Sequence, residues 1–229
     1  MIYEPNTIYH IYNQGNNRIP IFYQERNYIY FLKKVRKHLL PNVEFLAYCL
    51  MPNHFHFLVY TKPEACAASK QALTGVGVGK YNKSSGKSSG KSGGKSGGDF
   101  ESPLDWETSD EAYMQNLSYE LSIMLRSYTR AINKQEGRSG ALFREKTKAK
   151  NGIIDSFITI DGKNKDLFFQ PSNNYHQVCF DYIHDNPVKA KLCAKPIDWR
   201  YSSAKDYAGV RRGTLCNQDL AKDLGLIFR

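Results

Sequence analysis

Two histidines separated by one residue have the spacing that best suits chemistry in this chain. His54 and His56 flank Phe55 in a run of β-forming residues that continues to Tyr60. Because side chains alternate between the two faces of a strand, both imidazoles should point to one face and Phe55 and Phe57 to the other. Two neutral imidazoles on one face can bind a single divalent ion. A pair of histidines on a half-exposed strand, with no ligand, fits the spacing equally well.

A tyrosine and an asparagine near the C-terminal end form a second pair. Tyr182 and Asn186 lie four residues apart in a segment expected to be helical, so they share a face of that helix. The hydroxyl could act as a nucleophile, and the amide oxygen could be a metal ligand. A tyrosine hydroxyl with a pKa near 10 is a weak nucleophile without help. The alternative is that Tyr182 is a packing aromatic and Asn186 caps the helix before Pro187.

Tyr128 is the rival nucleophile, because it lies in a predicted helix that carries several cations. It falls, however, on the apolar stripe of that helix, with Leu121, Leu125 and Ile132 at helical spacing. The residue four positions after it is Ile132, which offers no polar ligand. We therefore expect Tyr128 in the core and assign the nucleophile to Tyr182.

The charge of the chain favours a polyanionic partner. Lys and Arg number 32 against 22 Asp and Glu, a net charge of +10, which points to nucleic acid first and to an anionic membrane second. No apolar run approaches the roughly 20 residues needed to span a bilayer, and the N-terminus lacks the pattern of a secretion signal. Five cysteines, none in CxxC spacing, argue against a disulfide framework or zinc knuckle. We expect a cytoplasmic protein that does not bind membranes.

Several cations are spaced so that they would form basic faces. Arg126, Arg130 and Lys134 recur every four residues on a predicted helix, and three lysines alternate with Thr147 and Ala149 on a predicted strand. Such faces can contact DNA phosphates, although each residue taken singly could belong to a solvated charged surface. The residues expected to contact DNA are Arg126, Arg130, Lys134, Arg138, Arg144, Lys146, Lys148 and Lys150.

The elements that must position these residues can be read from periodicity and turn signals. Strands are expected at 7–12, 43–50, 54–60 and 141–150, and helices at 25–40, 115–135 and 175–188. A Met-Pro-Asn turn at 51–53 joins the two middle strands. The order β-α-β-β-α-β-α predicts an α+β fold, an antiparallel sheet with helices packed on one face.

One segment should lie outside any core. Residues 80–98 repeat Lys, Ser and Gly without a single aliphatic side chain, so we expect a flexible cationic loop. It is either a plain solvated linker, which charge runs usually are, or a strap that helps to hold DNA. The loop need not separate two domains, and we expect one domain over residues 1–229.

Three sequence blocks resemble one family. The run CLMPNHFHFLV at 49–59 resembles the His-hydrophobic-His motif of single-tyrosine HUH transposases, and more specifically that of REP-associated tyrosine transposases. The runs DYIHDNPVKA at 181–190 and DWRYSSA at 198–204 are similar to later segments of the same family, in the same order. The resemblance covers most of the chain except residues 62–111 and an insertion near 151–172. These departures put substrate contacts in doubt more than the chemistry.

The resemblance implies a fold and an activity. It implies a ferredoxin-like (RRM-like) sheet of the HUH nuclease fold, with His54, His56 and Asn186 as ligands of Mg²⁺ or Mn²⁺ and Tyr182 as the nucleophile. The protein would be a DNA transposase, a nicking endonuclease that cleaves and rejoins single-stranded or hairpin-flanking DNA through a 5′-phosphotyrosine. Short palindromic repeat elements would be its substrate. Monomer and homodimer both stay open.

Two other function classes remain. The first is a non-catalytic nucleic-acid-binding protein on the same scaffold, such as a domesticated repressor. The second is an RNA-binding sheet module, which would expose aromatic side chains on its central strands; here histidines are expected at that position.

Overall fold

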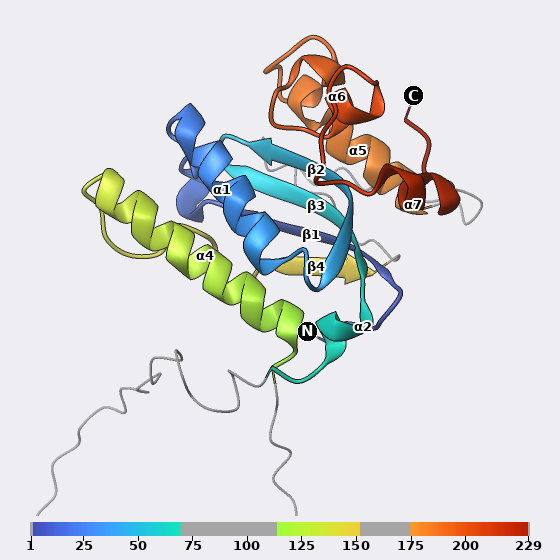
Figure 1. Cartoon of the computed structure of the whole chain (residues 1–229). Helices are drawn as coiled ribbons and strands as arrows, with labels where there is room; N and C mark the ends of the chain where they lie inside the picture. Colours follow the sequence, from blue (N-terminus) through green and yellow to red (C-terminus); the bar gives the residue numbers. More distant parts are fainter. Residues whose placement is uncertain (1, 70–113, 152–174, 229) are drawn as a thin grey trace, which may run out of the picture.

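Within the part of the chain that the structure describes, the sheet has four strands. The computed structural model describes residues 2–69, 114–151 and 175–228, and all strands in these ranges are antiparallel to their neighbours, in the order β2-β3-β1-β4 (Figure 1). The bounds are β1 Ile8–Gln14, β2 Val43–Met51, β3 His54–Thr61 and β4 Lys148–Asn151. The loop at 80–98 lies outside the described residues, as does the insertion near 151–172 except for Asn151, the last residue of β4.

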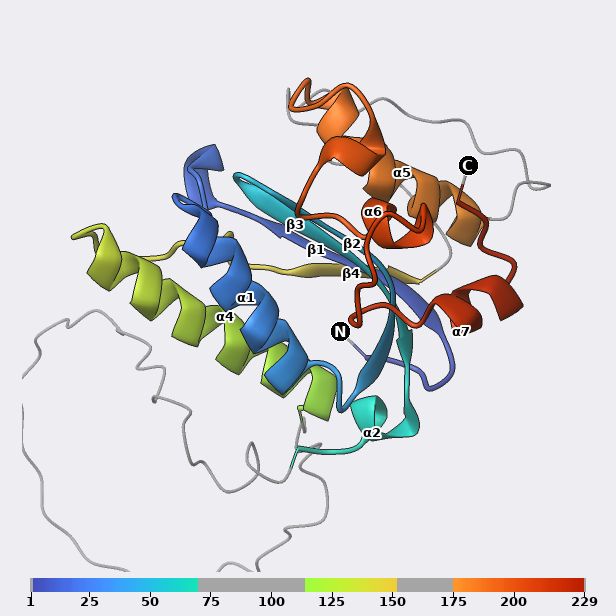
Figure 2. The same ribbon diagram turned by 45° about the horizontal axis from the view of Figure 1, so that its top comes forward.

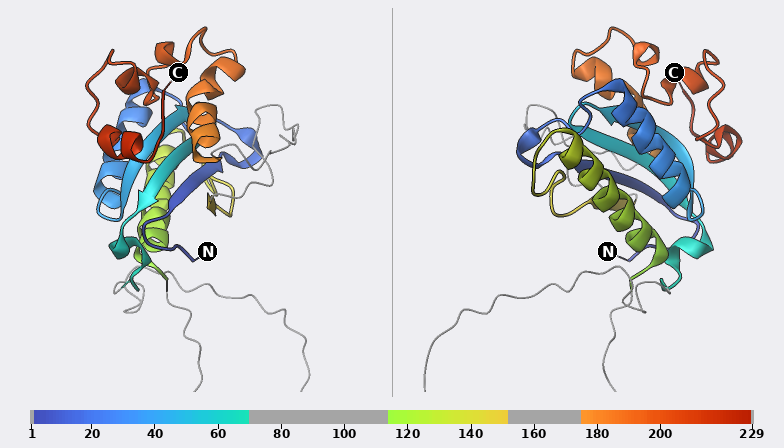
Figure 3. Two further views of the ribbon diagram at one scale, coloured as in Figure 1. Left: turned by 90° about the vertical axis from the view of Figure 1, so that its right-hand side faces the viewer. Right: turned by 60° about the vertical axis from the view of Figure 1, so that its left-hand side comes forward.

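Two long helices cover one face of this sheet. They are α1, Glu25–His38, and α4, Asn116–Gln135, which lie side by side in front of the strands in the right-hand view of Figure 3. Their apolar stripes bury Phe31, Val35 and Tyr128 against Phe55 and Phe57 of β3. With β1, α1, β2, β3, α4 and β4 in this order, the predicted α+β, ferredoxin-like arrangement is confirmed.

A third helix crosses the other face of the sheet, which differs from the expectation of helices on one face alone. This helix, α5, Tyr175–Lys189, packs mainly on β2 and on β3. The physical reason is that the second face is apolar as well, with Leu46 and Leu58 fully buried against Phe180 and Ile183. Pro187 does not end α5, which continues to Lys189, so Asn186 is inside the helix rather than a cap.

The chain after α5 is fastened to the edge strand β2. The Trp199 indole N–H donates to the Leu50 carbonyl at 3.0 Å, the Leu50 N–H donates to the Tyr201 carbonyl at 2.9 Å, and Ser202 forms a bridge to Cys49. The short helices are η1 Asn16–Arg18, α2 Pro63–Cys66, η2 Pro196–Asp198, α6 Ala204–Tyr207 and α7 Gln218–Asp223. Figure 2 shows α5, α6 and α7 gathered over the same side of the molecule. Within the described ranges, no helix is long and apolar enough to cross a membrane.

The last strand is shorter than predicted. The expected strand at 141–150 is a strand only from Lys148, and the residues before it contact the ends of α4 and β1 through an isolated bridge and hydrogen bonds. There the Asn133 amide donates to the Gly140 carbonyl at 2.8 Å and the Arg144 N–H donates to the Gln14 carbonyl at 2.9 Å.

Candidate functional site

His54 and His56 share one face of β3, the face that α5 covers. Their ring centroids are 4.9 Å apart, and only 2% and 1% of these residues is exposed. Strand alternation therefore placed both imidazoles on the same side, as predicted. This face is not open to solvent, because α5 packs over it.

The turn before His54 fixes one imidazole. Asn53 Oδ1 lies 2.6 Å from His54 Nδ1, and the Asn53 amide N–H₂ points to the Arg18 carbonyl at 3.4 Å. The amide oxygen can only accept, so His54 Nδ1 carries the proton and Nε2 keeps its lone pair. His54 Nε2 is buried and has no hydrogen-bond partner in residues 2–69, 114–151 and 175–228.

A glycine holds this turn in place. The Gly15 N–H donates to the Asn53 carbonyl at 2.7 Å, and the Ile21 N–H donates to the Pro52 carbonyl at 2.8 Å. A Cβ on Gly15 would lie 2.1 Å from the Ile19 carbonyl oxygen, far inside van der Waals contact. Only glycine fits at this position without moving the backbone that supports Asn53.

The second imidazole meets a residue that the sequence did not single out. His56 Nδ1 lies 2.9 Å from His10 Nε2, and the two rings stack with centroids 5.1 Å apart. His56 Nε2, like that of His54, is buried without a hydrogen-bond partner among the residues that the structure describes. His10 belongs to the predicted first strand, but only the register of β1 on β3, with Tyr12 opposite His56, brings it near the pair.

Helix α5 brings Tyr182 and Asn186 to the same place. The Tyr182 ring lies 5.4 Å from the His56 ring, at an interplanar angle of 86°, and 6.3 Å from the His10 ring. Tyr182 and Asn186 are buried, and Asn186 Nδ2 lacks a hydrogen-bond partner within the described ranges. Four residues chosen from two distant sequence blocks thus meet between the sheet and the helix that crosses it.

Burial sets the charge states of these groups. It lowers the pKa of His54 to about 4, which the neighbouring Asn186 side chain partly opposes. Burial, and then His54 and His10, hold the pKa of His56 well below its usual value, so both imidazoles are neutral at pH 7 and able to bind a metal. Burial also raises the pKa of Tyr182 to about 12, with Asn186 acting in the opposite direction. The hydroxyl needs added positive charge before it can react.

The structure places three lysines close to the site. Lys189 Nζ lies 5.3 Å from the centre of the Tyr182 ring, a contact that sequence reasoning missed. Their i, i+7 spacing on a helix is the signal that could have found it. Lys148 and Lys150, predicted to contact DNA, pair with Tyr12 and His10. Because directly paired residues point to the same side of a sheet, both lysines lie on the histidine face.

The other predicted DNA contacts lie elsewhere. Arg126, Arg130 and Arg144 line a cavity of about 810 Å³ between α4 and residues 140–147, on the sheet face that α1 and α4 cover. Lys134 and Lys146 are exposed, and Arg138 reaches the Ala141 carbonyl at 3.5 Å. The basic residues therefore form two separate groups on opposite faces of the sheet rather than one surface.

Tyr128 is far from this chemistry. It is fully buried between α1, α4 and the sheet, and its hydroxyl donates to the Ile21 carbonyl at 2.7 Å. The strand alternation that points His54 and His56 to one face points Phe55, which shares the core of Tyr128, to the opposite one. The rival tyrosine is thus a core residue, as its place on the apolar stripe predicted.

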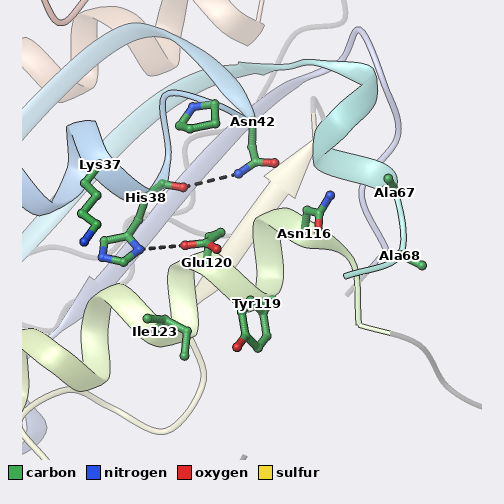
Figure 4. Close-up of a pocket in the computed structure, with 10 residues that line it drawn as sticks. Lys37, His38, Asn42, Ala67, Ala68, Asn116, Tyr119, Glu120 and Ile123 are labelled. Atoms are coloured by element: carbon green, nitrogen blue, oxygen red, sulfur yellow. Dashed lines mark hydrogen bonds and ion pairs between the residues drawn. The ribbon is translucent and has the colours of Figure 1, made fainter. Parts of the chain in front are cut away.

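A second cavity, of about 650 Å³, lies where the C-terminal end of α1 meets the start of α4 (Figure 4). His38 Nδ1 is 2.7 Å from Glu120 Oε2 there, with Lys37 and Asn116 on the rim. This cavity lies on the side of the sheet that α1 and α4 cover, and none of the residues singled out from the sequence lines it.

The two histidine Nε2 atoms and the Asn186 amide oxygen could hold a divalent ion. Within the described ranges, no group of three or more His, Cys, Asp or Glu side chains could hold a metal. The donor set here is different: two imidazole Nε2 lone pairs and the amide of Asn186. Such a set leaves positions for phosphate and water oxygens, which suits Mg²⁺ or Mn²⁺.

Comparisons with known proteins give one structural likeness. No family model matches the sequence, and no curated protein matches it. A solved structure described as a REP-associated tyrosine transposase bound to a REP hairpin is similar, with a TM-score of 0.48 and 14% sequence identity. The likeness covers 91% of this chain and 83% of the other. At this TM-score and identity, it assigns neither a family nor an activity to the chain.

Proposed function

We propose that this protein is a metal-dependent enzyme that nicks and rejoins single-stranded DNA. The observation that carries the proposal is the meeting of His54, His56, Tyr182 and Asn186, with both histidine Nε2 atoms buried and without a hydrogen-bond partner among the described residues. Buried polar atoms without partners are uncommon in proteins and call for a reason, such as a bound ion. The sequence resemblance to REP-associated tyrosine transposases assigns roles to the same four residues.

Tyr182 would attack the scissile phosphate. The phenol oxygen forms a bond to phosphorus while the bond from phosphorus to the 3′ oxygen breaks, leaving a 5′-phosphotyrosine and a free 3′-hydroxyl. The proton that Tyr182 gives up matches the one that the 3′ oxygen gains, so the exchange of esters consumes no water and no nucleotide. The reverse exchange rejoins strands, because the energy of the broken bond is kept in the phosphotyrosine.

The neighbouring residues would prepare this reaction. His54, His56 and Asn186 would hold Mg²⁺ or Mn²⁺, which when bound polarises the phosphate oxygens. Lys189, beside the Tyr182 ring, would favour the phenolate against the burial that raises its pKa. Lys148 and Lys150 would bind neighbouring phosphates of the strand on the histidine face.

The net charge of +10 supports DNA as the partner. The resemblance adds single-stranded or hairpin DNA and short palindromic repeat elements as the substrate class.

The test is a covalent adduct. The protein is incubated with Mn²⁺ and a hairpin oligonucleotide that carries a label at its 3′ end, on the fragment that a 5′-phosphotyrosine keeps bound. This should give a labelled protein band that survives boiling in detergent. Tyr182→Phe should abolish this band and Tyr128→Phe should retain it. A band that persists in Tyr182→Phe and disappears in Tyr128→Phe would overturn the assignment.

A second candidate is a non-catalytic nucleic-acid-binding protein. The cavity lined by Arg126, Arg130 and Arg144 favours it, because this basic group lies on the face away from the histidines and needs no metal. Hairpin binding that is unchanged in EDTA and by His54→Ala, with no adduct from any hairpin, would support this candidate instead.

A further inference from the structure

One histidine near the site has no role in the proposed chemistry. His10 comes from β1, is 4% exposed, and places Nε2 2.9 Å from His56 Nδ1. Its ring is held from two sides, by Tyr12 with centroids 4.8 Å apart and by Tyr182 at 6.3 Å. Packing therefore fixes the direction in which His10 Nε2 points.

The short distance between the two nitrogens means that one of them carries the shared proton. If His10 donated, His56 Nδ1 would accept and the proton of His56 would sit on Nε2. That N–H would then be a buried donor without an acceptor in the described part of the chain, where His56 Nε2 has no partner. If His56 donates from Nδ1, its Nε2 keeps a lone pair.

The neighbouring histidine indicates which arrangement the site uses. The Asn53 oxygen forces the proton of His54 onto Nδ1, so His54 Nε2 bears a lone pair. A matching lone pair on His56 Nε2 would give a divalent ion two donors. An N–H there would leave only one. Metal-binding histidines usually donate their other ring N–H to a polar group that orients them.

We propose that His10 is a positioning residue that accepts the Nδ1 proton of His56 and so keeps His56 Nε2 free to bind a divalent cation. The inference rests on the proposed metal site, but the tautomer that it assigns can be measured in metal-free protein. His10 would do for His56 what Asn53 does for His54. Both partners are supplied by the sheet and its turn, so the histidine pair is oriented before any ion arrives.

The test compares three variants of the full chain. His10→Phe keeps a ring of similar size without an acceptor, and His10→Gln restores an acceptor oxygen. Tyr12→Phe is the matched control, since Tyr12 also packs on His56 (centroids 5.7 Å apart) and its hydroxyl has no hydrogen-bond partner in the described part of the chain. Two quantities are measured: the ¹⁵N shifts of the His56 ring in long-range ¹H–¹⁵N spectra without metal, and Mn²⁺ affinity by calorimetry.

The wild type and Tyr12→Phe should show His56 protonated on Nδ1. His10→Phe should move that proton to Nε2 and weaken Mn²⁺ binding by about 10-fold or more, the usual effect of removing such a partner. His10→Gln should restore the Nδ1 proton and most of the affinity. Circular dichroism checks folding; if His10→Phe does not fold, the wild-type and His10→Gln spectra still decide.

A wild-type His56 protonated on Nε2 would overturn the inference, as would an unchanged tautomer and affinity in His10→Phe. Failure of the proposed function looks different. A wild type with the Nδ1 proton that binds no Mn²⁺ overturns the metal site while the His10–His56 hydrogen bond stands. Normal Mn²⁺ binding without any covalent DNA adduct overturns the nuclease while leaving His10 as the orienting residue.

Discussion

The ring of Tyr182 meets the ring of His56 edge to face, with centroids 5.4 Å apart. His56 comes from the middle of the sheet and Tyr182 from a helix near the other end of the chain, so their distance depends on how α5 packs on β2 and β3. Phe180 and Ile183, on either side of Tyr182 in sequence, are fully buried in that interface. The proposed nucleophile is therefore held by an apolar interface, and substitutions that keep this interface should separate chemistry from folding.

The metal assignment predicts that His54→Ala or His56→Ala abolishes adduct formation and weakens Mn²⁺ binding by at least about 10-fold, because each removes one of few protein donors. Both residues are buried, so each variant should also lose about 1–3 kcal/mol of stability. Calorimetry with Mn²⁺ and urea unfolding measure the two effects. His38→Ala, in the cavity on the other side of the sheet, is the control and should bind Mn²⁺ normally. Full activity in EDTA would contradict the assignment.

The two tyrosines should separate stability from chemistry. Tyr128→Phe removes the hydroxyl that donates to the Ile21 carbonyl and leaves that carbonyl buried, which should cost about 1–2 kcal/mol in urea unfolding. Its adduct yield should match the wild type at a temperature where both are folded. Wild-type stability in Tyr128→Phe together with an absent adduct would mean that the core position of Tyr128 is not its main role.

The two basic groups predict separate contributions to DNA binding. Lys148→Ala with Lys150→Ala should lower both hairpin affinity and adduct yield, because these lysines share the histidine face. Arg126→Ala with Arg130→Ala should lower hairpin affinity if DNA reaches the sheet face that α1 and α4 cover. Removal of one cation that neutralises a phosphate should reduce the slope of log K against log salt by about 0.7 for a single strand and about 0.9 for a duplex stem. Exposed Lys222 in α7 provides the control, and a slope that changes as much in Lys222→Ala would contradict local binding of the phosphates.

The buried histidines predict a loss of stability in mild acid. Burial lowers the pKa of His10 and His184 to about 3 and that of His54 to about 4, from ordinary values near 6.5. Below pH 6.5 these histidines bind protons in the unfolded chain but stay neutral in the folded chain. The free energy of unfolding should therefore fall as pH falls from 6.5 toward 4, by up to about 1.4 kcal/mol per pH unit for each histidine.

Urea unfolding in EDTA at pH 7, 6 and 5 measures this loss. His184→Asn, which replaces a buried imidazole away from the metal-facing nitrogens, should make the pH dependence shallower. Equal stability at pH 7 and pH 5 would contradict the neutral, buried state of these rings.

Local periodicity was enough to predict which side chains share a face. Alternation along β3 set His54 and His56 on one side and Phe55 on the other, and helical spacing set Tyr182 and Asn186 on one face of α5. The apolar stripe of α4 likewise predicted Tyr128 in the core. These relationships depend only on the geometry of a single strand or helix, which neighbouring residues in sequence determine.

Only the tertiary structure decided what lies opposite those faces. The register of β1 on β3 brought His10 to His56, and the apolar second face of the sheet drew α5 over the histidines and buried them. The pairing of β4 with β1 places Lys148 and Lys150 on the histidine face. Arg126 and Arg130 of α4 lie on the opposite face of the sheet. Contacts between elements depend on strand register and on which apolar surfaces bury one another. Those are properties of the packed core as a whole, and no single segment of the sequence contains them.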